Sequence, residues 1–381
     1  MKKVIGTNTI GYPEIRNFTG LPFSRYRVLK KQNLYKIPAY LYFKFKNNTH
    51  QYFWNTFNDM DFHNVELFHF FNGLSVGKTP WVTTFETVLP RWGNDKLIRK
   101  GLELVARDSC KKIIAISACT ANLQKKLVQD KYPELEHEIE EKLMVLHPAQ
   151  KKIISSYDDK KLDSEYIVFA MVGNQIFSKG GREVIAVLSE FVKKGYPVKL
   201  NLVSNLSSDN YATMTSEKDI VVMKGLIEGN KHYINHYCNI SNIEVIELLK
   251  ESHVALLPTY ADTYGYFVLE AQAAGCPVVT TNIRALPEIN NNEIGWMIKV
   301  PLDEESNGVL VSTLDRKIFS KAISDQLYPI IEEIISSREL IKEKGIRSLL
   351  KIDAVHSVGE NVAVLESLYD EVSNVKTLAK V

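Results

Sequence analysis

One stretch of this chain is more informative about its fold than any other, Pro258-Thr259-Tyr260-Ala261-Asp262-Thr263-Tyr264-Gly265-Tyr266-Phe267-Val268-Leu269-Glu270. It overlaps the apolar run HVALLP at 253–258 and is followed by AQAAGCPVV at 271–279. A short, unbroken apolar run is typical of a strand buried on both faces of a parallel sheet, and the Thr-Tyr-Gly turn then leads into an Ala-rich helix. The stretch therefore predicts a strand, a loop and a helix start, with a ligand site at the carboxyl end of the strand.

Two carboxylates lie in this stretch, Asp262 in the loop and Glu270 about two turns inside the helix. Unpaired N–H groups at the first turn of a helix suit the oxygens of a sugar or a phosphate. Asp262 can bind hydroxyls at the reacting end of a ligand, while Glu270 points toward a more distant hydroxyl pair such as a ribose. The pattern predicts a nucleotide-sugar site. The alternative is that Asp262 caps a helix and Glu270 makes a surface ion pair.

The same stretch resembles the acidic-x7-acidic motif of retaining GT-B glycosyltransferases of the family-4 type, the glycosyl transferases group 1. The first acid of that motif is usually Glu, and this chain has Asp262, which leaves the preferred sugar open. The resemblance implies an α/β fold with two Rossmann-like domains facing a cleft, the GT-B architecture. It also implies that Asp262 and the backbone of Tyr264, Gly265, Tyr266 and Phe267 hold the sugar, and that Glu270 binds the ribose.

A second loop, Val172-Gly173-Asn174-Gln175-Ile176-Phe177-Ser178-Lys179-Gly180-Gly181-Arg182-Glu183, opens into another helix. Glycines admit close backbone approach and a helix start is positive, so the loop suits a diphosphate. It is similar to the family's G-R-x-x-x-x-K-G segment, in which Arg and Lys bind the leaving diphosphate. Lys179 matches, Asn174 stands at the Arg position, and Arg182 or a basic residue of the first domain is the expected substitute. The implied donor-binding residues are Gly173, Asn174, Lys179, Gly180, Asp262, Tyr264, Gly265, Tyr266, Phe267 and Glu270.

In the first half, VELFHFFNG at 65–73 and KTPWVTTFET at 78–87 resemble two consecutive family segments. The second usually ends in His-Asp, and here the pair is Phe85-Glu86. An aromatic ring cannot exchange protons, so Glu86 joins Asp262 and Lys179 as a candidate catalytic residue, alone or with His69. A lone His in an aromatic strand is more often a satisfied core residue. Ser117, at a strand-to-helix turn, is expected to be a helix N-cap.

The 381 residues exceed the usual size of one core and predict two domains. Hydrophobic residues make up 45% and charged residues 24%, with a formal net charge of +2, which is ordinary for a globular protein and gives no argument for nucleic acid. Cys110, Cys119, Cys238 and Cys276 form no C-x-x-C pair, which favours neither zinc nor disulfides and indicates a reducing cytoplasm. No signal peptide or membrane span of ~20 apolar residues is expected. Asp59-Met60-Asp61 is discounted as a metal motif, so no metal and no cofactor are expected.

Apolar runs in the second half alternate with helical patterns, which predicts βαβ units on a parallel sheet; the runs lie at 166–173, 198–204, 219–225, 253–258 and 276–281. Candidate strands of the first half lie at 39–45, 65–71, 79–85, 111–117 and 142–148. We expect residues 1–150 to form an N-terminal acceptor-side Rossmann-like domain and residues 151–350 the nucleotide-sugar-binding domain. Residues 146–165 read as the linker. The resemblance implies that a helix in 351–381 packs back on the first domain.

From Arg25 to Trp54 basic residues interleave with aromatic residues. Such a segment could contact anionic headgroups, stack single-stranded nucleic acid, or form a half-buried strand with solvated lysines. The plain structural interpretation is preferred and nucleic acid is set aside. Peripheral contact with the inner face of the membrane stays open.

Together these features predict transfer of a sugar, with retention, from a UDP-, GDP- or ADP-sugar to the hydroxyl of a glycan or lipid-linked acceptor. Surface polysaccharide, lipopolysaccharide or glycolipid is the product class suggested by analogy with the family. Two alternatives stay open: a non-catalytic homologue that supports a partner enzyme, and a nucleotide-sugar 2-epimerase. The sugar, base, acceptor, linkage and oligomeric state are not determined by the sequence.

Overall fold

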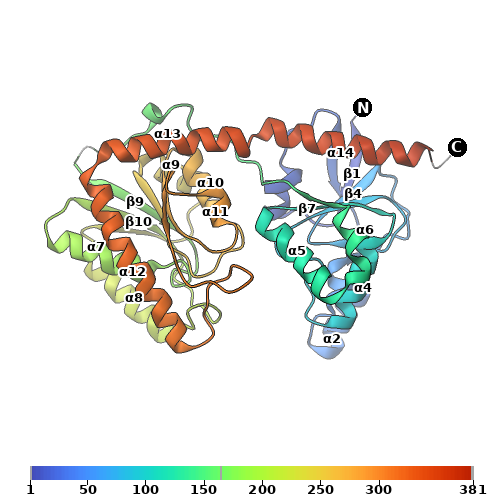
Figure 1. The fold of residues 1–381 in the computed structure, drawn as a ribbon, viewed down its shortest axis with the longest axis horizontal. Coiled ribbons are helices and arrows are strands. Elements are labelled where there is room, and N and C mark those ends of the chain that lie inside the picture. Colours follow the sequence, from blue (N-terminus) through green and yellow to red (C-terminus); the bar gives the residue numbers. More distant parts are fainter. Residues whose placement is uncertain (1, 164, 379–381) are drawn as a thin grey trace. The chain divides into compact units, whose positions relative to one another are not determined.

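The computed structural model describes residues 2–163 and 165–378, and the chain divides into two compact units (Figure 1). The N-terminal unit comprises residues 1–149 and 356–381, and the C-terminal unit comprises residues 150–355. Compared with the expected domains, the first boundary differs by one residue, and residues 351–355 lie in the C-terminal unit. Residue 164 of the expected linker and residues 379–381 of the expected terminal helix lie outside the described residues.

The N-terminal unit contains a six-stranded parallel sheet in the order β2-β1-β4-β6-β7-β8. Its strands are β1 (Lys3–Thr7), β2 (Tyr26–Lys30), β4 (Leu67–Phe71), β6 (Trp81–Phe85), β7 (Cys110–Ala115) and β8 (Leu143–Val145). A separate two-stranded sheet pairs β3 (Thr56–Phe57) with β5 (Leu74–Ser75). Its α-helices are α1 (Tyr12–Glu14), α2 (Lys36–Lys46), α3 (Gln51–Asn55), α4 (Asp95–Ala106), α5 (Ala118–Lys131), α6 (Glu136–Glu140) and α14 (Val358–Leu378). The strands expected at 65–71, 79–85, 111–117 and 142–148 are confirmed.

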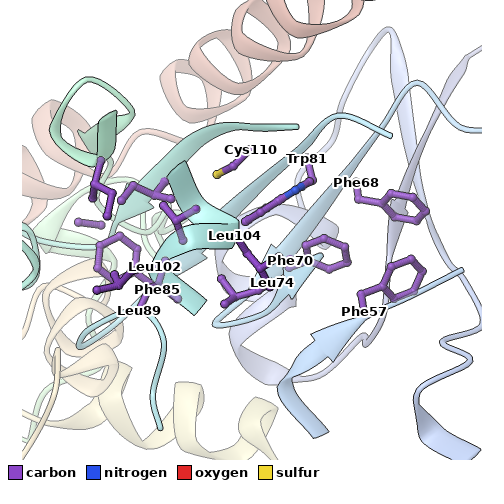
Figure 2. Packing of buried hydrophobic residues seen from close by; sticks show 14 of the residues in the cluster. Phe57, Phe68, Phe70, Leu74, Trp81, Phe85, Leu89, Leu102, Leu104 and Cys110 are labelled. Atoms are coloured by element: carbon purple, nitrogen blue, oxygen red, sulfur yellow. The ribbon is translucent and has the colours of Figure 1, made fainter. Parts of the chain in front are cut away.

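Aromatic side chains fill the core of this unit (Figure 2). Phe57, Phe70, Trp81 and Phe85 are fully buried, and Phe68 is nearly so. Every residue of β4 and β6 is buried, as expected for strands covered on both faces. Burial of each large apolar side chain stabilises the fold by roughly 1.5–3 kcal/mol, so this cluster holds the sheet and the loops at its carboxyl edge in place.

The strand expected at 39–45 is wrong, because these residues lie in helix α2. The alternation of aromatic residues with Leu and Lys imitates the two-residue period of a strand. Ala, Leu and Lys are also good helix formers, and Pro38 in the first turn is compatible with a helix start. Asn47, in the left-handed conformation at φ 46°, ends the helix.

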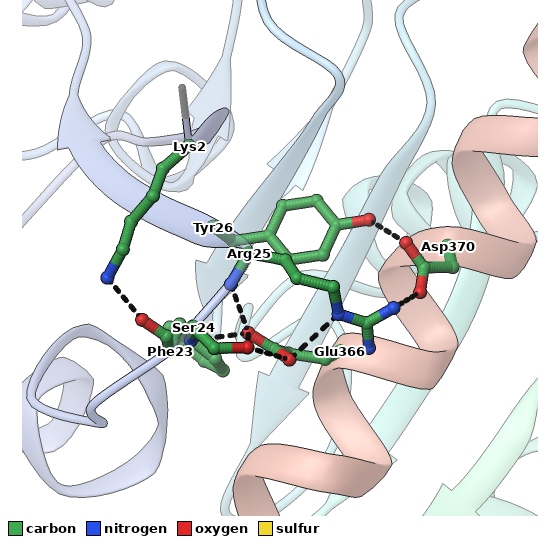
Figure 3. Close-up of polar contacts among 7 residues, drawn as sticks. All are labelled: Lys2, Phe23, Ser24, Arg25, Tyr26, Glu366 and Asp370. Carbon is green, nitrogen blue, oxygen red and sulfur yellow. Dashed lines mark hydrogen bonds and ion pairs between the residues drawn. The ribbon is translucent and has the colours of Figure 1, made fainter.

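Helix α14 is fastened to the start of the N-terminal unit through polar contacts (Figure 3). The buried Glu366 carboxylate accepts hydrogen bonds from the backbone N–H groups of Ser24 at 2.7 Å and Arg25 at 2.8 Å, and from Arg25 Nε at 3.0 Å. Asp370 accepts from Tyr26 Oη at 2.5 Å and pairs with the Arg25 guanidinium. Residues more than 340 positions apart in the sequence therefore share one fold unit.

The C-terminal unit contains a parallel sheet in the order β11-β10-β9-β12-β13-β14. Its strands are β9 (Ile167–Val172), β10 (Val198–Val203), β11 (Ile234–Tyr237), β12 (Val254–Leu257), β13 (Val278–Thr281) and β14 (Trp296–Ile298). Its α-helices are α7 (Gly181–Lys193), α8 (Glu217–Gly229), α9 (Asn242–Glu251), α10 (Tyr266–Ala273), α11 (Leu286–Ile289), α12 (Thr313–Ser336) and α13 (Arg338–Val355). The apolar run at 219–225 lies inside α8, and the polar strand β11 was not predicted. The chain winds outward in both directions from the neighbours β9 and β12, which is the doubly wound order with a topological switch point between them.

Among the described residues, none of the helices is both long enough and apolar enough to cross a bilayer. All four cysteines are free thiols, and those of Cys110 and Cys276 are buried.

Candidate functional site

The switch point brings together the two loops that the sequence singles out. Strands β9 and β12 pair side by side, with Val254 opposite Phe169 and Ala255 opposite Ala170. Beyond these strands, Tyr260 N donates to the Ser178 carbonyl oxygen at 2.8 Å, and Thr259 Oγ1 donates to the same oxygen at 2.9 Å. The loop after β9 and the loop after β12 are thus joined at the carboxyl edge of the sheet, where ligands of such folds bind.

Two glycines shape this edge. Gly180 has φ +82°, and a Cβ placed on it would lie 2.2 Å from the Pro258 carbonyl oxygen. Gly265 has φ +91°, and a Cβ there would lie 2.6 Å from Leu286 Cδ2. Both are N-cap residues, of α7 and α10 respectively, and a glycine cap has no side-chain acceptor for the first N–H groups. Two helix starts with positive dipole ends therefore face the same edge.

Lys179 and Asp262 form an ion pair between these helix starts. Lys179 Nζ lies 2.7 Å from Asp262 Oδ2 and 3.1 Å from the Ala261 carbonyl oxygen. Asp262 Oδ1 accepts from Tyr264 N at 3.2 Å, so this carboxylate is held by the turn ahead of the Gly265 cap. Each of the two side chains is 21% exposed, and the pair is therefore accessible to a ligand.

The other residues of this stretch that are predicted to bind the donor lie in α10 or directly before it. Glu270 lies on the second turn of α10 and is buried, which contradicts the alternative of a surface ion pair. Tyr264 is buried, and its ring lies 5.3 Å from that of Tyr266. Tyr266 and Phe267 are half-buried. The start of α10 therefore carries half-buried aromatic side chains beside the Gly265 cap.

The residues of the β9 loop have different surroundings. A Cβ at Gly173 would lie 2.9 Å from Lys179 Cγ, so this glycine makes room for the lysine stem. Asn174 is exposed, and its backbone carbonyl accepts from the hydroxyls of Ser204 at 3.1 Å and Ser207 at 3.0 Å. The Arg182 guanidinium is paired with Asp219 of α8 at 3.1 Å. Arg182 is thus committed elsewhere, which is against the expected substitution for the missing family Arg.

A buried polar network behind the loop was missed by the sequence reasoning. Tyr260 Oη donates to Glu183 Oε1 at 2.7 Å, and Ser320 Oγ donates to the same oxygen at 2.5 Å. Burial, and then the nearby Glu183 carboxylate, raises the pKa of Tyr260 far above its usual value, so the phenol keeps its proton. The Tyr260 ring also stacks on Phe319 at 4.7 Å. Because these partners are distant in the sequence, no spacing pattern could have paired them.

In the N-terminal unit, Glu86 directly follows the buried Phe85 at the end of β6. Its carboxylate contacts the Arg91 guanidinium and accepts from Asn72 Nδ2 at 3.3 Å, while Glu86 N donates to Asn72 Oδ1 at 3.2 Å. Asn72 was not singled out, although an Asn-Gly pair directly after an apolar run is a turn signal. Glu86 is therefore a positioned and partly accessible carboxylate at the carboxyl edge of this sheet.

His69 is a satisfied core residue. It is fully buried, with Nδ1 2.7 Å from Tyr369 Oη and Nε2 2.8 Å from Thr84 Oγ1, and it stacks on Phe18 at 3.8 Å. Burial lowers the pKa of His69 to about 3, so the ring is neutral. Ser117 is the N-cap of α5 and accepts from Thr120 N at 3.0 Å, as expected.

Asp59 and Asp61, the two acids of the discounted metal motif, are held within the protein. Asp61 Oδ1 accepts from Lys78 N at 2.8 Å and from Thr79 N at 3.2 Å, and Asp59 is buried. Across residues 2–163 and 165–378, no group of three or more His, Cys, Asp or Glu side chains is placed to hold a metal ion.

Residues 155–326 match the protein family described as Glycosyl transferases group 1. The capsular polysaccharide biosynthesis glycosyltransferase CapM of Staphylococcus aureus is 28% identical over 156 residues, which are 37% of each chain. A glycogen synthase of Mycobacterium tuberculosis is 26% identical over 125 residues, 32% of this chain and 28% of that protein. The chain thus matches less than two fifths of the length of these relatives.

Solved structures resemble the whole chain. HepE of Anabaena, in complex with UDP-glucose, has a TM-score of 0.58 and 13% identity, with 100% of both chains covered. A glycosyltransferase from Rickettsia africae has a TM-score of 0.57 and 16% identity, with 97% of this chain and 90% of that one covered. At such identities the likeness shows the fold, two Rossmann-like units of the GT-B type. Residues 155–326, with the switch-point site between β9 and β12, thus match the model of the Glycosyl transferases group 1 family, and the chain has the GT-B fold.

Proposed function

We propose that this chain is a retaining glycosyltransferase that moves a sugar from a nucleotide diphosphate sugar to an acceptor hydroxyl. The observation that carries the proposal is the Lys179–Asp262 pair, 2.7 Å apart, between the glycine-capped starts of α7 and α10. This arrangement offers one cation and two positive helix ends to a diphosphate, and one carboxylate to sugar hydroxyls.

In the proposed complex, Lys179 and the N–H groups that follow Gly180 bind the diphosphate, with Gly173 and Asn174 in the same loop. Charge builds up on the diphosphate as the glycosidic bond breaks, and a fixed cation then stabilises the transition state more than the ground state. Asp262 and the backbone of residues 264–267 bind the sugar, and Glu270 binds the ribose. Because the positive field comes from Lys179 and the helix ends, the proposed chemistry assigns no step to a metal.

Retention is consistent with these roles. The leaving phosphate can accept the proton of the acceptor hydroxyl on the same face of the sugar, so the reaction needs no separate base. Glu86, held by Asn72 and Arg91, is the proposed contact for the acceptor or the sugar in the N-terminal unit.

The comparisons support the substrate class. HepE binds UDP-glucose, and this supports a nucleotide sugar, with UDP as the first base to test. CapM acts in capsular polysaccharide biosynthesis, and this supports a glycan or lipid-linked acceptor of a surface polysaccharide, lipopolysaccharide or glycolipid. Free thiols at all four cysteines fit a reducing cytoplasm.

The test is a thermal-stabilisation screen of UDP-, GDP- and ADP-sugars, repeated with Asp262→Ala and Glu270→Ala, together with detection of donor hydrolysis. A ligand that binds only the folded state raises its apparent stability by mass action. We expect one donor to stabilise the wild type and to be hydrolysed slowly. Glu270→Ala should lose this stabilisation, and Asp262→Ala should lose hydrolysis and the part of the stabilisation that the sugar adds to that of the free nucleotide. A donor that binds but is never turned over, with or without acceptors, would favour the non-catalytic homologue. Absence of binding by every donor would refute the site.

A further inference from the structure

Helix α2 presents an apolar face to solvent. Of its eleven residues only Ala39 is buried. Five large apolar side chains are exposed by 46–78%; we define the α2 surface as these five, Ile37, Tyr40, Leu41, Phe43 and Phe45, together with Lys36, Lys44 and Lys46. In Figure 1 the helix lies at one end of the N-terminal unit, away from α14. A cluster of apolar side chains of this kind on a globular protein marks a surface that meets a partner.

The charge around this surface has one sign. Residues 25–58 contain no Asp or Glu, and their seven basic residues are Arg25, Arg27, Lys30, Lys31, Lys36, Lys44 and Lys46. The segment therefore carries +7 in a chain of net charge +2, so the other residues sum to −5. Arg25 is neutralised by Glu366 and Asp370. Among the described residues none of the other six basic side chains forms an ion pair, and they form a basic segment on an otherwise acidic chain.

The apolar and basic residues are arranged as in a helix that lies flat on a membrane. Ile37, Leu41 and Phe45 follow one another at four-residue spacing, so they form one stripe along the helix. Tyr40 and Lys44 form a second row beside it, and Lys36 belongs to the same exposed side by its spacing. Aliphatic residues enter the acyl boundary, aromatic rings lie at the headgroup level, and lysine stems reach toward phosphates.

Aromatic contacts pack the opposite side of α2 against α3 and the residue before it. Tyr42 packs edge-on against His50 at 4.9 Å, and Tyr35 packs edge-on against Phe53 of α3 at 5.3 Å. Trp54 of α3 is itself 59% exposed. The inner side of α2 is therefore packed on α3, while Ile37, Leu41 and Phe45 of the apolar stripe stay 46–78% exposed. A helix that is packed on one side and exposed on its apolar side is typical of a docking surface rather than of a frayed helix.

We propose that the α2 surface docks on an anionic phospholipid bilayer. Lysines without acidic neighbours match anionic headgroups, each contributing to attraction at the surface. Ile37 and Leu41 of the stripe are aliphatic, so they add apolar area for insertion among acyl chains but no ring on which bases of single-stranded nucleic acid could stack. The docking does not depend on the proposed donor site, since α2 is far in sequence from Lys179 and Asp262. If both hold, the surface brings the transferase to lipid-anchored acceptors.

The experiment is co-sedimentation of the full chain with vesicles of phosphatidylcholine alone and of phosphatidylcholine with an equal part of phosphatidylglycerol, at low and high salt. We expect binding to the anionic vesicles only, weakened by salt. Lys44→Glu/Lys46→Glu should lower this binding by at least about tenfold, because two attractive charges become repulsive. Leu41→Ser/Phe45→Ser should lower it to a similar extent without changing the net charge.

Matched controls come from α8, where Val222 is 71% exposed and Lys224 is also exposed. Val222→Ser and Lys224→Glu should leave vesicle binding within twofold of the wild type, about the scatter of single surface changes. Donor stabilisation should be the same in all four variants and the wild type, which separates this proposal from that of the donor site. Lack of binding to anionic vesicles would overturn the proposal, as would equal loss in the α8 controls. So would retention of a fluorescent single-stranded oligonucleotide by the wild type in place of vesicles.

Discussion

The backbone of Gly180 approaches the carbonyl oxygen of Pro258 so closely that a Cβ on this glycine would lie 2.2 Å from it. The contact joins the loop after β9 to the loop after β12, and each loop carries one member of the Lys179–Asp262 pair. The spacing of cation and carboxylate is therefore set by a backbone contact, and a side chain at residue 180 would force the two loops apart.

Gly180→Ala should destabilise the C-terminal unit by about 3 kcal/mol or more. The left-handed backbone alone costs an alanine roughly 1–2 kcal/mol, and displacement of the Pro258 carbonyl adds to this. Gly195 is a matched control, because it has φ +85° but nothing within 4 Å of an added Cβ. Gly195→Ala should cost only about 1 kcal/mol. Calorimetric unfolding of both variants checks this, and equal losses would show that the Pro258 contact is unimportant.

The ion pair predicts a non-additive effect on nucleotide binding. Lys179→Ala leaves the Asp262 carboxylate facing the diphosphate, so UDP affinity should fall by at least about tenfold. Asp262→Ala should change UDP affinity little. The double variant should bind UDP more tightly than Lys179→Ala does, with a coupling energy of about 1 kcal/mol by titration calorimetry.

A control for this cycle is Lys199→Ala, which breaks a similar pair with Asp163 at 3.6 Å near the start of β10. This change lies at the amino end of a strand, away from the switch-point loops, and should leave UDP affinity unchanged. Strict additivity of the two single changes would mean that Lys179 and Asp262 act on the ligand independently.

Glu366→Gln should destabilise the N-terminal unit by about 2 kcal/mol at neutral pH, because the carboxylate accepts charge-assisted bonds from Arg25 and from backbone N–H groups.

Burial by itself raises the pKa of Glu366, but the bonds from Arg25 and Ser24 outweigh it and hold the pKa below its usual 4.5. The stabilisation is thus complete above pH 4.5 and is lost as the pH falls through the lower folded value. Denaturant titrations at several pH values should show this loss in the wild type, and little of it in Glu366→Gln. Glu371→Gln, an exposed position on the same helix, should behave as the wild type.

His69 predicts a second pH dependence. Its pKa is about 3 when folded and 6.5 as the ordinary value, so the unfolded chain binds one more proton between these limits. Stability of the N-terminal unit should be complete above pH 6.5 and fall as the pH drops toward 3, with a slope of up to about 1.4 kcal/mol per pH unit from this residue. His69→Gln does not titrate, and its amide can still hydrogen-bond at the Nε2 position next to Thr84. Its curve should be flatter between pH 4.5 and 6.5, and an unchanged slope there would contradict the assignment.

Much of the fold follows from local pattern. The mostly apolar runs at β4, β6, β9 and β12 predict these strands, because strands buried on both faces carry no regular polar alternation. Helix α2 was misjudged because its alternating aromatic residues imitate a strand, although no neighbouring strand pairs with them. Strand β11, with the sequence INHY, was missed because its pattern is not apolar. In both cases tertiary surroundings, rather than local preference, decide the structure.

The candidate site also contains both residues that local sequence identifies and contacts that only the tertiary structure reveals. Lys179, Asp262 and the two capping glycines could be singled out because their type and spacing are local. The hydrogen bonds of Tyr260 to Glu183 and of Asn72 to Glu86 could not, because each bond joins elements that are separate in the sequence: the loop after β12 with α7, and the ends of β4 and β6. Arg182 was expected near the diphosphate from its place in the sequence, but its helical position directs it to Asp219.

The N-terminal unit is discontinuous, since residues 356–378 complete what residues 2–149 begin. During synthesis, the strands of that sheet emerge first but lack the partner of Ser24, Arg25 and Tyr26 until α14 has been made. The whole of residues 150–355 appears in between and can close its own sheet without help. The unit that is translated first is therefore the one that finishes folding last, and its early strands are exposed to aggregation for the longest time.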